Sequence, residues 1–297
     1  MLIGFHDYER QSRDLAAALG APLEFARVHR FPDGESKLTL PVPLPADVVF
    51  CRSLNAPNDK LVELMLAANA ARELGAERLT LVAPYLCYMR QDTAFSPGEA
   101  VSQRIAGTFL AGLFDRVLTV DPHLHRTARL SDAVPAREVV SLSAAGEMGA
   151  FLQARFEDAF VLGPDAESLQ WAAAVAAPGG FEVAACQKTR TGDREVEVRL
   201  PEIALAGRAV VLVDDVASTG RTLATAAGHC ARRGAKSVDV MVTHALFVGD
   251  AVAELRRAGV REIWSTDSVT HASNVLPLAG TIARGLALSS SDLRPQQ

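Results

Sequence analysis

Residues 210–223 read VVLVDDVASTGRTL, an apolar run that leads into two adjacent carboxylates, Asp214 and Asp215, and then into a turn of small residues. Such a run is typical of a strand that is covered on both faces of a sheet and is followed by a helix. Backbone N–H groups at the start of that helix favour a bound phosphate. Carboxylates suit sugar hydroxyls or a divalent cation instead. The stretch therefore predicts a sugar-phosphate site, or alternatively a helix cap beside two solvated acids.

The same alternation of apolar runs and amphipathic segments continues on both sides of this stretch. We expect strands within 47–53, 78–85, 116–123, 158–165, 181–188 and 237–244, and helices within 60–76, 100–114, 168–176, 221–235 and 250–259. Strands that alternate with helices in this way indicate the α/β class with mainly parallel sheets. Residues 21–48 do not fit the pattern and are expected to form an extended or hairpin excursion.

A domain junction is expected within residues 131–147, which contain a proline and little periodicity. Similar strand–helix patterns lie on either side of it, so we predict two αβα domains, over residues 1–143 and 144–297. The runs that end at Asp121 and Asp165 resemble the one that ends at Asp214, because each places an acid just past apolar residues. Ligands of open α/β sheets bind beyond the carboxyl ends of strands, so these acids predict polar clefts.

Composition excludes several classes of protein. The chain has 297 residues, of which 49% are hydrophobic and 22% charged, as is typical of a globular protein. Its net charge of -5 argues against a nucleic-acid-binding protein. No apolar stretch approaches the roughly 20 residues that a membrane helix needs. The charged residues among the first ten argue against a signal peptide.

The four cysteines, Cys51, Cys87, Cys186 and Cys230, are scattered and form no CxxC pair. Neither a zinc site nor a disulfide framework is therefore suggested. The first three lie in apolar, strand-like surroundings and are expected to be buried thiols. A reducing cytoplasm fits this usage best.

Several motifs together resemble one enzyme family. Residues 210–223 resemble the phosphoribosyl-pyrophosphate (PRPP) motif that type I phosphoribosyltransferases share with PRPP synthases. Residues 58–92 resemble the PRPP synthase (ribose-phosphate diphosphokinase) family over their whole length, including the signature PY-x-x-Y-x-RQD. Residues 116–123 and 234–247 resemble further segments of that family. The similarity runs from about Phe31 to the last helix, whereas simple transferases lack the N-terminal half.

The resemblance implies a fold and an activity. Two domains of the type I phosphoribosyltransferase kind are expected, with the last helix packed back on the first domain. The implied enzyme is a transferase of nucleotide biosynthesis, a pyrophosphokinase that uses ATP, ribose 5-phosphate and Mg²⁺. It moves the β,γ-pyrophosphoryl group of ATP to the C1 hydroxyl of ribose 5-phosphate and yields PRPP and AMP. A homo-oligomer, either a dimer or a hexamer, is implied as well.

The resemblance also implies an ATP site. FPDGES matches the nucleotide loop of the family, in which Phe31 would stack on adenine and Asp33 and Glu35 would accept from its amino group. This loop is expected to reach the site of a neighbouring subunit. The implied ATP-binding residues are Phe31, Asp33, Glu35, Arg90, Gln91 and Asp92. On its residues alone, Arg90 suits a bidentate phosphate contact, and the alternative is a surface salt bridge.

The metal residues implied by the resemblance are His123 and Asp165. His125, two residues beyond His123, has no such support. The family's P-D-x-G-G becomes PDAES here, so Glu167 and Ser168 replace glycines. Glu167 either alters the metal shell or only adds a favourable charge at the start of a helix, and we favour the second interpretation.

Lys188 and Arg190 stand where the family has a catalytic K-x-R pair on a mobile arm. Two cations there would neutralise charge on the transferred pyrophosphoryl group. The residues that follow, TGDREVEV, have the polar alternation of an exposed hairpin. A merely solvated hairpin is the alternative.

The ribose 5-phosphate loop departs from the best-known members of the family at Ser218 and Arg221. Arg221 either adds charge at the phosphate or occludes the pocket, if the backbone there needs a positive φ that Arg disfavours. The implied binding residues are Asp214, Asp215, Ser218, Thr219, Gly220, Arg221 and Thr222.

Two rival functions stay open at this stage. One is a phosphoribosyltransferase that consumes PRPP, against which the intact MRQD and VDPH segments count. The other is a catalytically silent homologue that regulates a PRPP synthase. The departures at Glu167 and Arg221 favour a silent homologue, while the retained His123, Lys188 and Arg190 count against it.

Overall fold

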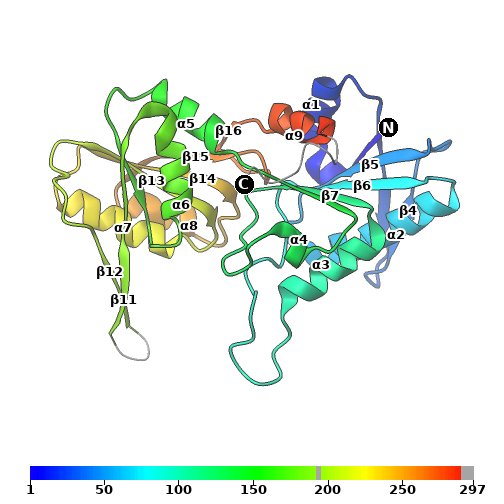
Figure 1. The fold of residues 1–297 in the computed structure, drawn as a ribbon, viewed down its shortest axis with the longest axis horizontal. Coiled ribbons are helices and arrows are strands. Elements are labelled where there is room, and N and C mark those ends of the chain that lie inside the picture. The colour runs from blue at the N-terminus through cyan, green and yellow to red at the C-terminus, as the bar shows by residue number, and fades with distance from the viewer. Residues whose placement is uncertain (192–194, 289–297) are drawn as a thin grey trace. The chain divides into compact units, whose positions relative to one another are not determined.

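The computed structural model describes residues 1–191 and 195–288 (Figure 1). It divides into two compact units. The first unit comprises Met1–Leu142 and a C-terminal segment that begins at Leu278, and the second comprises Ser143–Pro277.

The first unit is built on a parallel sheet of six strands. In spatial order the strands are β2 (Leu23–Phe25), β1 (Leu2–Gly4), β5 (Asp47–Cys51), β6 (Arg78–Val82), β7 (Arg116–Val120) and β8 (Glu138–Leu142). The helices are η1 (His6–Tyr8), α1 (Glu9–Leu19), α2 (Pro57–Glu73), α3 (Ser102–Leu113), α4 (Leu130–Ala133) and α9 (Ala279–Ala287). Figure 1 shows α1 and α9 on one face of the sheet and α2 and α3 on the other.

The sheet of the second unit also has six parallel strands. In spatial order they are β10 (Glu182–Ala185), β9 (Phe160–Gly163), β13 (Ala209–Ala217), β14 (Ser237–Ala245), β15 (Val260–Thr266) and β16 (Asn274–Leu276). The helices of this unit are α5 (Ala145–Gln153), α6 (Leu169–Ala176), η2 (Ala177–Gly179), α7 (Arg221–Arg232) and α8 (Ala251–Arg257). The near-continuous burial of β13 and β14 agrees with a sheet covered on both faces.

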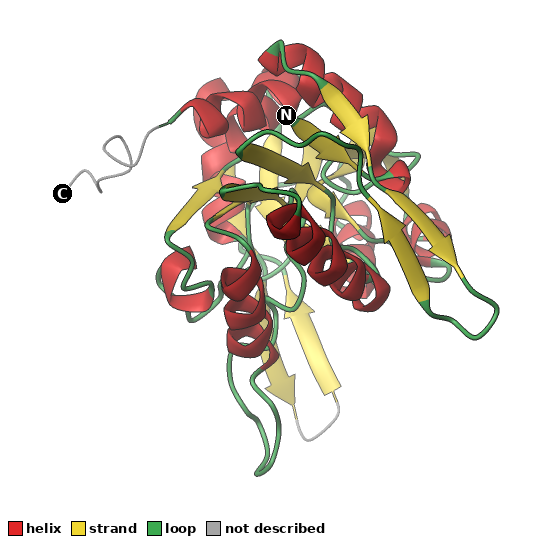
Figure 2. Cartoon of the chain, turned by 90° about the vertical axis from the view of Figure 1, so that its right-hand side faces the viewer, coloured by secondary structure: helices red, strands yellow, loops and turns green. Residues whose placement is uncertain are grey.

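Each unit also has an antiparallel hairpin outside its main sheet. In the first unit β3 (Arg27–Arg30) pairs with β4 (Ser36–Thr39). In the second unit β11 (Gln187–Thr191) pairs with β12 (Glu195–Arg199), which are the two strands joined by grey residues in Figure 2. Figure 2 also shows the yellow strands of the main sheets lying among red helices. The excursion expected at 21–48 thus contains one edge strand and a hairpin.

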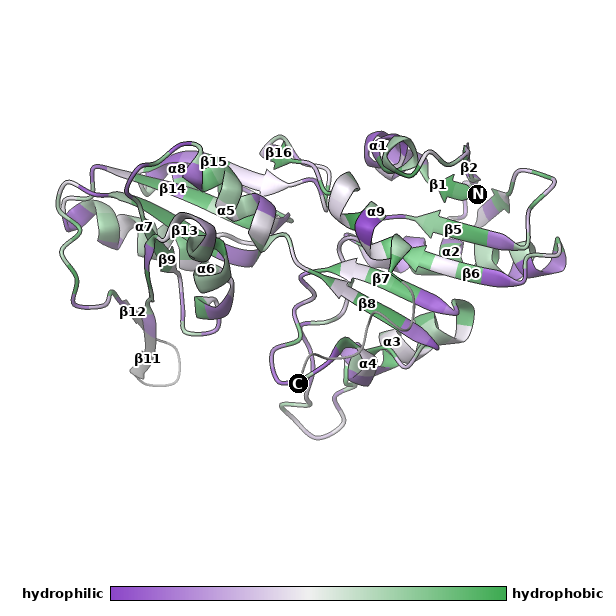
Figure 3. Cartoon of the chain, turned by 45° about the horizontal axis from the view of Figure 1, so that its top comes forward, coloured by the Kyte–Doolittle hydropathy of each residue, from purple (hydrophilic) through white to green (hydrophobic). Residues whose placement is uncertain are grey.

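The predicted α/β class with two parallel sheets is confirmed. The middles of the central strands are hydrophobic (Figure 3), and their side chains form the two cores. Helix α2 begins at Pro57, whose fixed φ suits the first turn, and is followed by Gly75 at φ +95°. All four cysteines are buried free thiols, and burial raises the pKa of Cys87 to about 12.

The strand that carries Asp214 and Asp215 extends beyond the apolar run of residues 210–213. Strand β13 does not end before the acids but runs on to Ala217. The ladder continues because Asp214 and Val216 pair with Val242 and His244 of β14. Residues 131–147, where a domain junction was expected, contain the edge strand β8, the start of α5 and the boundary between the two units, after Leu142. Among the described residues, no helix is both long and apolar enough to cross a membrane.

Candidate functional site

The turn after β13 has the geometry expected of a phosphate-binding loop. Gly220 caps the start of α7 in the left-handed conformation, with φ +70°, and Arg221 is the first helical residue. The positive φ therefore falls on glycine, and the backbone conflict considered for Arg221 does not arise. Thr219 and Arg221 are exposed, so the start of the helix is open to a ligand.

The loop that follows β14 holds this turn in place. Leu246 and Phe247 donate their backbone N–H groups to the carbonyl of Ala217, at 3.0 and 2.9 Å. Val248 donates to the carbonyl of Ser218 at 3.0 Å. These bonds fix the turn from one side, so its shape does not depend on a ligand.

Three carboxylates of the second unit act on one another beside this turn. Burial raises the pKa of Asp214 well above its ordinary value, and the charges of Asp215 and then Asp165 raise it further. Asp215 is only 2% exposed and donates its N–H to Oδ1 of Asp214 at 3.0 Å. Such crowding of like charges is the environment that a cation or hydroxyl donors would relieve.

Asp165 follows β9 and is held by Ser168. The Ser168 hydroxyl donates to the Asp165 carbonyl at 2.7 Å, and the Ser168 N–H donates to Asp165 Oδ1 at 3.0 Å. A Cβ on Gly163 would lie 2.6 Å from that hydroxyl, so glycine makes room for it. Ser168, which sequence reasoning noted only as a departure, therefore positions Asp165. Glu167 is exposed just ahead of α6, where a negative charge is favourable.

The expected catalytic pair lies on the hairpin of the second unit. Lys188 and Arg190 both belong to β11 and pair with Val198 and Val196 of β12. Their side chains lie outside what the structure describes.

The MRQD segment of the first unit lies in the loop after β6, and its three polar residues differ in their surroundings. Arg90 is exposed, and no described residue pairs with it. Gln91 Oε1 accepts from the Ser102 hydroxyl at 2.7 Å. The Asp92 side chain is 1% exposed, and its two oxygens accept from Nη1 and the backbone N–H of Arg126, each at 3.0 Å. Arg90 is thus presented to a ligand, whereas Asp92 ties this loop to the one that follows β7.

His123 lies in that second loop, half-buried, with its ring centroid 6.1 Å from that of His125. No group of three His, Cys, Asp or Glu side chains suited to a metal occurs within residues 1–191 and 195–288. Mg²⁺ is usually held by one or two carboxylates together with substrate phosphates and waters. The crowded carboxylates around Asp165 and Asp214 fit that role, and an imidazole such as that of His123 is a less usual ligand.

The nucleotide loop predicted at FPDGES is the tip of the β3–β4 hairpin. Gly34, at φ +95°, donates to the carbonyl of Phe31 at 2.9 Å, and Phe31 donates to the carbonyl of Glu35 at 2.8 Å. The Asp33 carboxylate accepts from the Glu35 N–H at 3.1 Å. Phe31 is 39% exposed, and Asp33 and Glu35 are exposed too. The loop therefore presents one aromatic ring and two acids to solvent.

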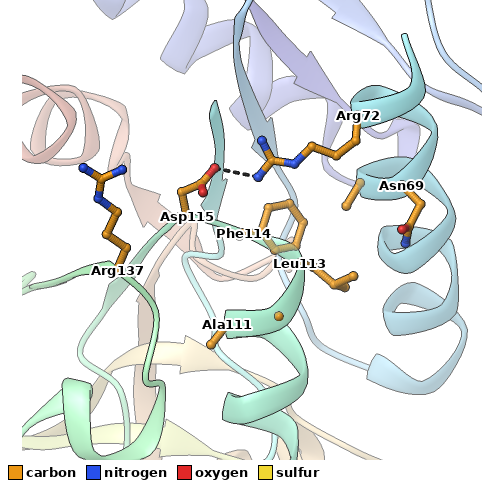
Figure 4. Close-up of a pocket in the computed structure, with 9 residues that line it drawn as sticks. Asn69, Arg72, Ala111, Leu113, Phe114, Asp115 and Arg137 are labelled. Atoms are coloured by element: carbon orange, nitrogen blue, oxygen red, sulfur yellow. Dashed lines mark hydrogen bonds and ion pairs between the residues drawn. The ribbon is translucent and has the colours of Figure 1, made fainter. Parts of the chain in front are cut away.

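A separate pocket of the first unit lies near the amino ends of strands β7 and β8 (Figure 4). Figure 4 shows Asp115, which precedes β7, between Arg72 of α2 and Arg137, which precedes β8. Asp115 Oδ2 pairs with Arg72 at 2.7 Å. No predicted site residue lines the pocket.

Comparisons with known proteins agree with this arrangement. Residues 1–113 match a family model described as the N-terminal domain of ribose phosphate pyrophosphokinase, and residues 145–289 match a phosphoribosyl transferase domain. A phosphoribosylpyrophosphate synthetase of Mycobacterium smegmatis has the same fold, with a TM-score of 0.84 and 24% identity over 96% of both chains.

Two curated relatives are similar over nearly their whole length. The chain is 38% identical to ribose-phosphate pyrophosphokinase of Methanopyrus kandleri, covering 92% of this chain and 94% of that protein. It is 34% identical to ribose-phosphate pyrophosphokinase of Halobacterium salinarum, covering 96% of this chain and 100% of that protein. The resemblance deduced from the motifs is confirmed, and the chain belongs to the ribose-phosphate pyrophosphokinase family.

Proposed function

We propose that this protein is a ribose-phosphate diphosphokinase, which converts ATP and ribose 5-phosphate into AMP and PRPP. Membership of the family supports the reaction, because the relatives at 38% and 34% identity bear that name and align over most of the chain. The observation that carries the proposal is the strand end of β13. It places the crowded pair Asp214 and Asp215 directly before a turn that opens a helix through Gly220.

Ribose 5-phosphate binds at this strand end. Asp214 and Asp215 accept from the sugar's 2- and 3-hydroxyls or meet them through a cation. The turn from Ser218 to Thr222 holds the 5-phosphate with backbone N–H groups and hydroxyls, as helix N-termini commonly do. Arg221, exposed at the first helical position, adds positive charge there.

ATP binds through two segments of the first unit. Phe31 stacks on the adenine ring, and Asp33 and Glu35 accept from its amino group. Arg90 and Gln91 hold the phosphates. Asp92, bonded to Arg126, keeps this segment beside the loop that carries His123.

The reaction is an in-line displacement at phosphorus. The C1 oxygen of ribose 5-phosphate forms a bond to the β-phosphorus of ATP as the bond from that phosphorus to the α–β bridging oxygen breaks. AMP leaves with the electron pair, and the hydroxyl proton passes to solvent. Lys188 and Arg190 neutralise the charge on the transferred group, so positioning and electrostatics supply the catalysis.

The ligands proposed for Mg²⁺ are Asp165 and His123. When bound, the ion neutralises phosphate charge and orients the phosphates. The raised pKa of Asp214 supports a cation near the carboxylates of the second unit.

A single assay separates the proposed enzyme from its rivals. Purified protein with Mg²⁺, ATP and ribose 5-phosphate is expected to release AMP and PRPP in equal amounts, with a Lys188→Ala variant as the control. No AMP above that control would leave the silent homologue as the better interpretation. Consumption of added PRPP with a free base would instead indicate a phosphoribosyltransferase.

We further propose that the enzyme acts in the cytoplasm as a homo-oligomer, either a dimer or a hexamer, without nucleic-acid or membrane partners. Four buried free thiols support a reducing compartment. Light scattering coupled to size exclusion would measure the mass, and a monomer with full activity would contradict the oligomer.

A further inference from the structure

Helix α2 of the first unit carries a buried carboxylate, Glu63, which is 2% exposed. Glu63 lies on the helix face that also buries Leu64 and Ala67. An ionised side chain at such a position needs partners, because burying a charge without them is costly. Both of its oxygens have such partners, and the two sets of partners belong to different parts of the fold.

One oxygen of Glu63 holds the base of the β3–β4 hairpin. Oε1 accepts from Arg30 Nη2 and from the Ser36 hydroxyl, each at 3.3 Å. Arg30 is the last residue of β3 and Ser36 the first of β4, and the two are paired across the hairpin. Glu63 therefore contacts both ends of the five-residue loop 31–35 at once.

The other oxygen is fixed to the main sheet. Oε2 of Glu63 lies 2.7 Å from Nη2 of Arg52, the residue that follows β5. Arg52 is 7% exposed by its side chain, lies 4.2 Å over the ring of Phe5, and donates from Nε to Asp7 Oδ1 at 3.0 Å. A chain of charges thus runs from the ends of β1 and β5 through Glu63 to the hairpin.

The charges in the inner half of this chain are paired with one another. Burial disfavours the charge of Asp7, but Arg52 and Lys60 outweigh that effect and lower the pKa of the Asp7 carboxyl. Lys60 Nζ lies 2.8 Å from Asp7 Oδ2 and also donates to the carbonyl of Ser53 at 2.7 Å. These interactions hold Arg52 in one geometry, and Arg52 in turn holds Glu63.

The core contacts of the hairpin, made by Leu38 and by the flanking residues Ala26 and Leu40, lie at the end away from the loop that Glu63 contacts. The hairpin is a separate two-stranded sheet, and isolated hairpins are marginally stable in water. The outer ion pair between Arg30 and Asp59, at 2.8 Å, is exposed and therefore contributes little. The position of the loop relative to the main sheet depends strongly on the buried contact.

We propose that Glu63 is a positioning residue that sets the nucleotide loop 31–35 for adenine. The proposal rests on the ATP-binding role given above to Phe31, Asp33 and Glu35. Glu63 itself touches neither substrate. Its function is to transmit the rigidity of the sheet to an exposed loop, as supporting hydrogen bonds do for other binding groups.

The test replaces Glu63 by glutamine, which keeps the shape but removes the charge shared by Arg30 and Arg52. We expect the KM and the calorimetric Kd for Mg²⁺-ATP to rise about tenfold, because a binding group misplaced by about 1 Å can cost on the order of 100-fold. The KM for ribose 5-phosphate is expected to stay within about twofold. A merely structural role would lower the active fraction and kcat without this selective effect on ATP.

Two milder variants keep the test valid if Glu63→Gln folds poorly. Arg30→Gln removes the contact with Glu63 and the exposed pair with Asp59, whereas Ser36→Ala removes only the contact with Glu63. Both leave the pair of Glu63 with Arg52 intact. Both should weaken ATP selectively, Arg30→Gln more than Ser36→Ala. The matched control is Glu73→Gln, an exposed acid at the end of the same helix, which should change neither constant.

The outcomes separate this inference from the proposed function. A wild-type protein that binds ATP but forms no PRPP would refute the reaction, while the Kd series would still test the loop. An active wild type with unchanged ATP constants in Arg30→Gln and Ser36→Ala would overturn the positioning role. Equal losses for ATP and ribose 5-phosphate in those variants would overturn it as well.

Discussion

In the first unit the third strand in spatial order, β5, is followed by the cation Arg52, whereas its counterpart in the second unit, β13, carries the acids Asp214 and Asp215. The two strands are counterparts because both sheets have the same order. In each, the first strand in sequence lies second, the next lies at the edge, and a hairpin precedes the third. The two units thus share the order of their strands, but the residues at the end of the third strand carry opposite charges.

The likeness extends to the start of the next helix. Ala56 precedes α2 with φ 48°, and Gly220 precedes α7 with φ 70°, so both helices begin after a left-handed residue. An acid also follows the strand that lies second in each sheet. It is Asp7 after β1 and Asp165 after β9. In the first unit Asp7 is neutralised by Arg52 and Lys60. In the second unit the charge of Asp165 instead raises the pKa of Asp214.

The difference teaches which strand end is prepared for a ligand. The charges of the first unit satisfy one another, so this end of the sheet supports its neighbours. In the second unit Asp214 is crowded by two other acids beside an open helix start, and a cation or hydroxyl donors would relieve that crowding. One fold therefore uses the same position once for structure and once, as we propose, for binding.

The largest expected effect comes from removing Arg52, the cation that follows β5 in the first unit. Arg52→Met leaves the buried Glu63 without its main partner and removes one of the two cations that pair with Asp7, which should lower the free energy of unfolding by about 3–5 kcal/mol. Urea denaturation followed by circular dichroism would measure the loss. The control is Arg10→Met, which removes an exposed pair with Asp14 and should cost no more than about 0.5 kcal/mol. Similar losses in both variants would contradict the view that burial makes the first unit's network strong.

The next effect concerns the acid pair of the second unit. Asp215→Asn should weaken ribose 5-phosphate binding about tenfold to a hundredfold, or about 1.4–2.7 kcal/mol, because a charged hydrogen-bond acceptor is lost. The affinity for ATP should change much less, since the ATP residues lie on other segments. Calorimetric titration of each substrate would show the split. Equal losses for the two substrates would argue against the sugar role of Asp215.

A smaller effect is expected in how the stability contributed by Asp214 and by Asp7 depends on pH. The pKa of Asp214 is raised in the folded state, so the folded chain binds its proton more tightly than the unfolded chain does. Stability from this group is complete below the ordinary pKa of 3.8 and is lost as the pH rises through the folded pKa. Between those two pKa values, Asp214→Asn should therefore gain stability over wild type by roughly 1.4 kcal/mol for each pH unit.

Asp7 should behave in the opposite sense. Its pKa is lowered, so its contribution is complete above 3.8 and is lost only as the pH falls through the lower folded value. Asp7→Asn should therefore show a deficit that stays constant from about pH 5 to 7. Urea midpoints of the three proteins across this range would measure both trends. A deficit for Asp214→Asn that grows with pH would reverse the assigned sign.

The smallest effect tests the shared left-handed residue. Gly220→Ala should cost about 1 kcal/mol of stability, since a Cβ there meets only an ordinary contact with Ala251 at 3.4 Å and the cost lies in the backbone. Ala56→Gly relieves the same strain and should be neutral or stabilising by up to about 1 kcal/mol. Thermal unfolding of the two variants would check the pair. A clear loss of stability in Ala56→Gly, or none in Gly220→Ala, would show that the two helix starts are not equivalent.

Much of the second unit's site was predictable because its signals are local in sequence. The apolar run, the acid pair and the small-residue turn adjoin one another in residues 210–223. Two structural features were missed for a different reason. Glu63 lies at helical spacing from Leu64 and Ala67, and this spacing indicates the buried face of the helix. Sequence reasoning missed it because glutamate is usually exposed to solvent. Ser168 stands at a helix start, where serine commonly caps.

The sequence by itself determined the α/β class, the family and the strand–turn–helix that we propose binds ribose 5-phosphate, because periodicity and motifs are properties of neighbouring residues. The tertiary structure alone decided which charges are satisfied. Asp7 and Arg52 are 45 residues apart in the chain, and Arg30 and Glu63 are 33 apart. Folding brings these partners together, and no local pattern records that. The same physics leaves Asp214 crowded by acids, and so distinguishes two strand ends that the backbone treats alike.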